Sequence, residues 1–64
     1  MAREAEWVEL CLDIVHDTDR AICVDDGDGR MVWLPRSTIR PSDVGTGPAD
    51  IEVQYWIAHR EGLI

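Results

Sequence analysis

The chain has 64 residues with 45% hydrophobic content, which allows a single domain, residues 1–64, with one small core. Thirteen Asp and Glu residues against six Arg give a formal net charge of −7, which disfavours nucleic acid and anionic membranes as partners and favours basic surfaces. No apolar run approaches the roughly 18 residues that cross a bilayer, and no signal-peptide pattern opens the chain, so we expect a cytoplasmic protein.

The first expected element is a strand over residues 6–16, where apolar and polar side chains alternate. A polar turn over residues 17–19 then reverses the chain. A regular antiparallel register opposes Ile14 to Ile22 and Leu12 to Val24.

The second expected element is a β-hairpin over residues 20–39. Two short apolar runs, residues 21–24 and 31–34, flank the turn-forming sequence Asp26-Gly27-Asp28-Gly29. With Asp26 opposite Arg30, Gly29 takes the positive φ that closes a three-residue loop. This register pairs Val24 with Val32, Ile22 with Leu34 and, on the other face, Cys23 with Trp33.

The remaining residues predict a tight turn, a loop, a short strand and a helix. Pro35 ends the third strand, and the turn over residues 36–39 tucks Ile39 into the core. Residues 40–50 are rich in Pro and Gly and predict a loop, residues 51–53 a fourth strand, and residues 55–61 a helix that ends at Gly62. We expect Trp56, Ile57, Leu63 and Ile64 to cover part of the sheet.

The predicted fold class is therefore α+β. It consists of a small antiparallel sheet, made of a three-strand meander with residues 21–25 in its centre plus a short fourth strand, and one short C-terminal helix. The predicted core consists of Val8, Leu10, Leu12, Ile14, Ile22, Val24, Val32 and Leu34.

Five carboxylates are candidates for a partner-binding patch. Residues two apart on a strand lie about 6.6 Å from each other and neighbouring strands about 4.8 Å apart, so adjacent acidic rows can approach the charge density of a nucleic-acid backbone. A solvated face that only maintains solubility explains the same residues, and composition alone favours it. The candidate carboxylates are Glu9, Asp13, Asp25, Asp26 and Asp28, with Trp33 as an apolar anchor.

Metal and catalytic sites are poorly supported. Residues 25–29 resemble a fragment of a calcium loop but lack its spacing and closing Glu, and the two Cys and two His lack paired zinc-ligand spacing. Cys11 and Cys23 fall inside strands, where a packed free thiol is commoner than an activated one. We therefore expect no catalytic residue, no metal and no cofactor.

Two segments resemble a family of small phage and prophage proteins. The segment RAICVDDGDGRMVWLPRSTI resembles their centre A-I-x-V-x-D-G…V-W-L-P-[KR]-S-x-I, and IEVQYWIAHREGLI resembles their tail I-E-[IV]-P-x-W-[LI]-A-x-x-x-G-L-I. Gln54 stands where the family usually has Pro. The match covers about half of the chain, and most members have no assigned activity.

Within that setting, an acidic chain of this length resembles the phage-encoded anti-CRISPR proteins, in particular the small inhibitors of type I-C systems. The resemblance implies a non-enzymatic DNA mimic in the host cytoplasm. Its partner would be a Cascade-type CRISPR interference complex, bound at a subunit with a basic DNA-binding groove. We expect a monomer that contacts neither nucleic acid nor membrane directly.

Two other functions remain open from the sequence. A phage accessory protein could bind a protein partner through an exposed face centred on Trp33, with weak dependence on salt. A regulatory protein could bind nucleic acid through Arg20, Arg30, Arg36 and Arg40, which the net charge disfavours.

Overall fold

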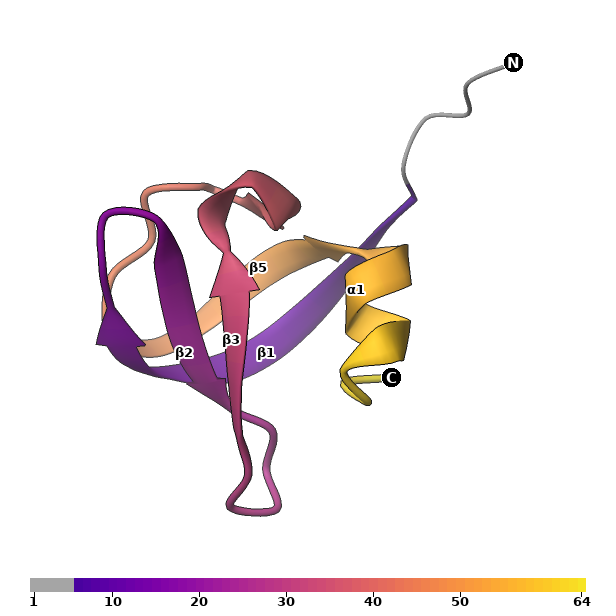
Figure 1. Ribbon diagram of the computed structural model, residues 1–64, viewed down its shortest axis with the longest axis horizontal. Helices are drawn as coiled ribbons and strands as arrows, with labels where there is room; N and C mark the ends of the chain where they lie inside the picture. The colour runs from indigo at the N-terminus through magenta and orange to yellow at the C-terminus, as the bar shows by residue number, and fades with distance from the viewer. Residues whose placement is uncertain (1–5) are drawn as a thin grey trace.

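The structure, a computed structural model, describes residues 6–64 and forms one antiparallel sheet of five strands with one short helix (Figure 1). The strand order is β3-β2-β1-β5-β4, which places β1 in the centre of the sheet. The elements are β1 (Trp7–Asp17), β2 (Ala21–Asp25), β3 (Met31–Pro35), the 3₁₀ turn η1 (Arg36–Thr38), β4 (Ile39–Arg40), β5 (Gly47–Gln54) and α1 (Tyr55–Arg60).

The β2–β3 hairpin has the predicted register. Val24 pairs with Val32 and Cys23 with Trp33, and the Asp26 amide donates to the Arg30 carbonyl oxygen at 3.0 Å. Gly29 has φ +85°, the left-handed value that the loop requires of its last residue. The hairpin turn projects from one end of the sheet in Figure 1. Turn chemistry and apolar pattern therefore specify this hairpin together.

The predicted β1–β2 register is wrong. Next to the turn, Ile22 pairs with Asp17 and not with Ile14, and further along the strand β1 contains a β-bulge. Ile14 pairs with Val24 but His16 pairs with Cys23, so Val15 is an extra residue without a partner on β2. The extra residue reverses the alternation of side chains beyond it. His16 consequently lies on the same face as Cys23.

The predicted strand count of three plus one is also wrong. Residues 47–50, expected as loop, belong to an eight-residue β5 that pairs with β1 along its whole length, and Ile39–Arg40 adds the short β4. The Tyr55 amide donates to the Glu6 carbonyl oxygen, and by alternation the nitrogen of Pro48 then faces away from β1. Pro48 thus removes no donor from the β1–β5 ladder.

The core lies on one side of the sheet, under η1 and α1. Ile39 is 2% exposed, as the predicted turn requires, and Ile57 and Ala58 bring the helix onto the same cluster. Trp56 and Ile64 are 50% exposed, so the expectation that they cover the sheet is wrong. The buried apolar side chains are Ile14, Ile22, Cys23, Val24, Val32, Leu34, Ile39, Ile51, Val53, Ile57 and Ala58, while Val8, Leu10 and Leu12 are only partly buried.

The helix ends as its sequence predicts. Gly62 has φ +76°, its amide donates to the His59 carbonyl oxygen, and the Leu63 amide donates to the Ala58 carbonyl oxygen at 2.8 Å. This arrangement satisfies carbonyl groups that would otherwise be left open at the helix end. It also turns Leu63 back onto the core.

Candidate functional site

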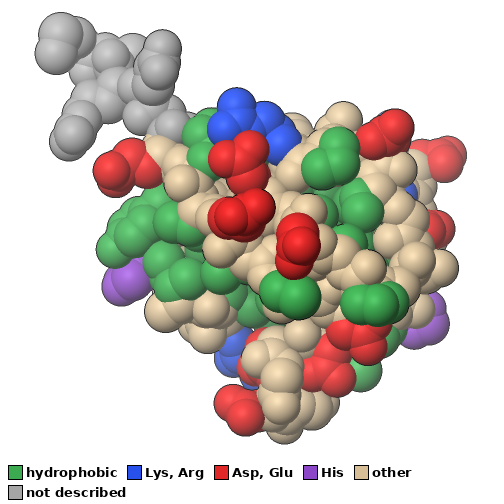
Figure 2. All heavy atoms as spheres, turned by 180° about the vertical axis from the view of Figure 1, so that it is seen from behind, with side chains coloured by type: hydrophobic (Ala, Val, Ile, Leu, Met, Phe, Trp, Pro, Cys, Tyr) green, Lys and Arg blue, Asp and Glu red, His purple; other side chains and the backbone are tan. Residues whose placement is uncertain are grey.

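The outer face of the sheet, opposite the core, carries most of the candidate side chains. Residues that pair directly across antiparallel strands share a face, so Glu9 lies beside Glu52, and Asp13 beside Asp25. Asp50 pairs with Cys11 between these two acidic pairs. We call this set the acidic face: Glu9, Asp13, Asp25, Asp50 and Glu52. In Figure 2 acidic side chains are spread over the face in view, with hydrophobic side chains between them.

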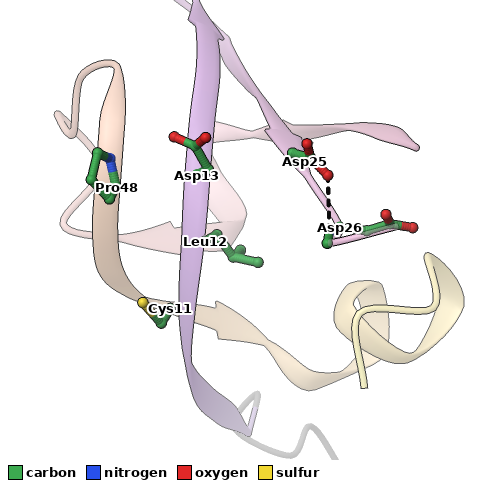
Figure 3. A pocket seen from close by; sticks show the side chains of 7 residues that line it. Cys11, Leu12, Asp13, Asp25, Asp26 and Pro48 are labelled. Carbon is green, nitrogen blue, oxygen red and sulfur yellow. Dashed lines mark hydrogen bonds between the residues drawn. The ribbon is translucent and has the colours of Figure 1, made fainter. Parts of the chain in front are cut away.

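Asp13 and Asp25 form the end of the acidic face nearest the hairpin (Figure 3). A directly paired position on neighbouring strands brings the two Cβ atoms to about 5 Å, a distance at which like charges repel unless a cation lies between them. Asp25 Oδ1 also accepts the Gly27 amide at 2.8 Å, which fixes that carboxylate. A shallow cavity of about 390 Å³ lies here, lined by Cys11, Leu12, Asp13, Asp25, Asp26, Gly27 and Pro48.

Cys11 contributes an exposed thiol to the middle of the acidic face. A hydrogen bond to Asp50 and the negative charge of that carboxylate raise the pKa of the Cys11 thiol above its ordinary value. A raised pKa lowers the thiolate fraction and therefore the reactivity of the sulfur. The site thus lacks an activated nucleophile at this position. Cys23, by contrast, is buried, and both thiols are free.

Arg40 is the one arginine among residues 6–64 whose paired position lies on the acidic face. Its Nη2 atom lies 3.4 Å from Glu52 Oε1, and its guanidinium carbon lies 3.8 Å from the ring centre of Trp7. Arg40 and Glu52 are each about half exposed, so the ion pair is a weak surface pair. It neutralises charge at one end of the face and leaves the other carboxylates without an ion pair to any described residue.

Asp26 and Asp28 occupy the hairpin loop, away from the strand rows. Asp26 Oδ1 accepts the amides of Asp28 at 2.8 Å and Arg30 at 3.2 Å, and its side chain is only 10% exposed. The hydrogen bond from Asp28, followed by those from Arg30 and its charge, lowers the pKa of Asp26 below its ordinary value. Asp26 therefore organises the loop, whereas Asp28 is exposed at the tip.

Trp33 lies on the same outer face, at the β3 edge of the sheet. It is 52% exposed and Met31 is 53% exposed, as an exposed face centred on Trp33 requires. The rings of Trp33 and His16 stack, with their centres 6.5 Å apart and their planes 11° apart. We call Met31, Trp33 and His16 the apolar margin. Cys23 pairs with both Trp33 and His16 and is 2% exposed.

The sequence analysis did not include Asp50 and Glu52 among the candidate residues. Asp50 lies in the segment that was expected to be a loop. Glu52 lies in the expected fourth strand, which was not connected to the patch. Their signal is the alternation that runs from Ala49 to Val53, where Asp50 and Glu52 are polar between buried or partly buried residues. Their neighbours on β1 become visible only from the strand order. Of the five carboxylates predicted from the sequence, Glu9, Asp13 and Asp25 thus lie on the acidic face, whereas Asp26 and Asp28 lie in the hairpin loop.

A second acidic hollow lies at the opposite end of the sheet and is closed by Arg36. The Arg36 guanidinium donates to the carbonyl oxygens of Thr18 at 2.7 Å and of Ser42 and Val44 at 2.8 Å. Asp17, Asp19 and Asp43 surround it. Among residues 6–64 no three His, Cys, Asp or Glu side chains gather in a way that could hold a metal ion.

Comparison with known proteins adds no relative. No protein-family model, curated protein or solved structure matches this chain. In the described part of the chain no helix is long and apolar enough to cross a membrane.

Proposed function

We propose that the acidic face binds a basic nucleic-acid-binding groove of another protein and competes with nucleic acid for that groove. One observation carries this proposal: five carboxylates from three neighbouring strands share one face, on which Arg40 is the one described arginine. A face that only maintained solubility would not need five carboxylates on adjoining strand positions, because dispersed charges keep a protein soluble equally well.

The spacing of the acidic face supports competition with a nucleic-acid backbone. Asp50 and Glu52 are two residues apart on β5, about 6.6 Å along the strand, and β1 lies about 4.8 Å to the side. These separations are shorter than the Debye length of about 8 Å at physiological salt, so a basic groove experiences several charges together. The association is then steered by charge and weakens with salt.

The segments that resemble phage and prophage proteins suggest which groove is bound. We propose a type I-C-like CRISPR interference complex as the partner and the groove where it holds target DNA as the binding site. The protein would act in the host cytoplasm as a non-enzymatic anti-CRISPR inhibitor. This mechanism needs affinity and no chemistry, in agreement with the raised pKa of the Cys11 thiol.

A second candidate function rests on the exposure of Met31 and Trp33. Two half-exposed large apolar side chains at one sheet edge are suited to a phage accessory module that binds a protein through hydrophobic contact. Such binding depends strongly on Trp33 and weakly on salt. The two functions therefore differ in their response to ionic strength.

The experiment measures inhibition of target-DNA binding by a purified type I-C interference complex, using a DNA mobility shift at 50 and 300 mM salt. The double variant Glu9→Arg with Asp13→Arg should lose inhibition by at least about 30-fold, because each reversed charge faces several cations at about 0.5 kcal/mol per pair in water. Trp33→Ala should have the smaller effect.

The matched control is Asp19→Arg with Asp43→Arg, which changes the net charge equally on exposed residues outside the acidic face. Equal losses for both double variants would mean that net charge alone acts, which contradicts a specific face. Inhibition that is insensitive to salt but lost in Trp33→Ala would favour the accessory module.

A further inference from the structure

The β3 strand leaves a row of backbone groups open at the edge of the sheet. In an antiparallel ladder, residues alternate between those that bond to the neighbouring strand and those that face away from it. The Asp26 amide donates to the Arg30 carbonyl oxygen and the Arg36 amide to that of Arg20, which assigns the even-numbered residues of β3 to bonds with β2. The amide and carbonyl groups of Met31 and Trp33 therefore face outward.

The open row has a defined length. At one end the Pro35 carbonyl oxygen accepts the Thr38 hydroxyl at 2.6 Å, and at the other end β3 begins at Met31, directly after the hairpin loop. Between them, no hydrogen bond within residues 6–64 engages the outward groups of Met31 and Trp33. The open edge can therefore pair with a short extended segment of about four residues.

We infer that the β3 edge accepts an extended segment of the partner protein that carries arginine at alternate positions. The inference rests on the proposed function and names how part of the partner is recognised. An added strand places alternate side chains on the outer face, next to Met31 and Trp33. A guanidinium there stacks on the exposed Trp33 ring and extends toward Asp25, which pairs with Met31 on the next strand.

Charge complementarity identifies the occupant as a basic segment. Asp13 and Asp25 lie side by side on the outer face within two strands of the edge, and Asp28 is exposed at the tip of the adjacent loop. A second copy of this chain could also pair through its own β3. It would bring the apolar side chains of Met31 and Trp33 to these carboxylates, and no cation that could neutralise them. A partner segment with arginine satisfies both the backbone row and the carboxylates.

The test measures binding of a fluorescein-labelled peptide of eight alternating arginine and valine residues by fluorescence anisotropy. Met31→Pro removes an outward amide without removing a donor to β2, and it should weaken binding at least tenfold. The matched variant Met31→Ala keeps the amide and should change binding less than threefold. Circular dichroism confirms that each variant is folded.

A modified peptide keeps the test decisive if Met31→Pro does not fold. N-methylation of alternate residues, in each of the two possible phases, removes backbone donors and leaves every charge in place. One phase should bind at least tenfold more weakly, whereas equal binding of all peptides would overturn the inference. That failure leaves the proposed function intact, since groove binding requires the carboxylates and no backbone pairing.

Light scattering at increasing protein concentration tests the competing occupant. A monomer across the concentration range agrees with the inference. A dimer that Met31→Pro abolishes, together with unchanged peptide binding, would assign the edge to a second copy and overturn the inference.

Discussion

Replacing Arg40 with Gln should weaken the fold and strengthen partner binding. The substitution removes the 3.4 Å ion pair to Glu52 and the stacking of the guanidinium on Trp7. An ion pair between half-exposed groups contributes about 0–1 kcal/mol, and a cation–π contact at such a site about 0.5–1 kcal/mol. We therefore expect the free energy of unfolding to fall by about 1 kcal/mol.

The effect on binding has the opposite sign, because Arg40 is a like charge to the basic groove. At about 8 Å in water, one pair of unit charges interacts by about 0.5 kcal/mol, and two such cations of the groove give about 1 kcal/mol. The Arg40→Gln variant should thus bind about fivefold more tightly at low salt. The gain should shrink toward the salt concentration at which the Debye length falls well below 8 Å.

The assays are urea denaturation for stability and the DNA mobility shift with a type I-C interference complex for binding. Arg60→Gln is the matched control: it changes the net charge equally, and Arg60 pairs with Glu61 at 3.9 Å on α1, which packs against the core side of the sheet. Binding of Arg40→Gln that equals or falls below that of Arg60→Gln would refute the assignment of the acidic face as the binding surface.

Three further substitutions test the parts of the fold that position the site. Gly62→Ala should destabilise the protein by about 1–2 kcal/mol in urea denaturation, because Gly62 has φ +76° and an added Cβ would lie 3.3 Å from Arg30 Nη2. Because the pKa of Asp26 is lowered in the folded protein, its stabilising contribution is complete above about pH 4 and is lost as the pH falls through the lowered pKa. The Asp26→Asn variant should therefore melt at a lower temperature than the unchanged protein at pH 7, and this difference should vanish in acid. The Arg36→Gln variant should lose three hydrogen bonds to backbone carbonyl oxygens, and its free energy of unfolding should fall by about 2 kcal/mol. If the guanidinium holds the loop over residues 41–46, amide hydrogen exchange there should become faster. Unchanged exchange would contradict this role.

The hairpin could be predicted from the sequence because its determinants are local. Gly29 and the flanking apolar runs specify turn, register and face within about fifteen residues. The helix end at Gly62 is local in the same sense. Both predictions were correct for this reason.

The bulge in β1 could not be predicted, and it determines part of the candidate site. Nothing in the residues around Val15 distinguishes a continuous strand from one with an extra residue, because Ile14 and Val15 are both apolar. The bulge moves His16 to the outer face, where it stacks on Trp33. Cys23, which pairs with both His16 and Trp33, is buried on this face.

The acidic face itself needed the strand order. Glu9, Asp13 and Asp25 were found from alternation within strands, but Asp50 and Glu52 join them only because β5 pairs with β1. Gly47 and Pro48 concealed that pairing, since both residues are common in loops. The proline is accommodated because its nitrogen faces away from β1, a property of register that composition cannot reveal.

The arrangement of the outer face explains why salt dependence and Trp33 dependence need not exclude each other. The acidic face centres on β1 and β5, whereas Met31 and Trp33 of the apolar margin lie on β3, beyond β2, at about 4.8 Å per strand. A partner long enough to cover both would lose its electrostatic part in high salt and keep its apolar part. In the mobility shift, inhibition should then fall steeply with salt to a residual plateau that Trp33→Ala removes. A loss to zero in the native chain would restrict the interface to the carboxylates.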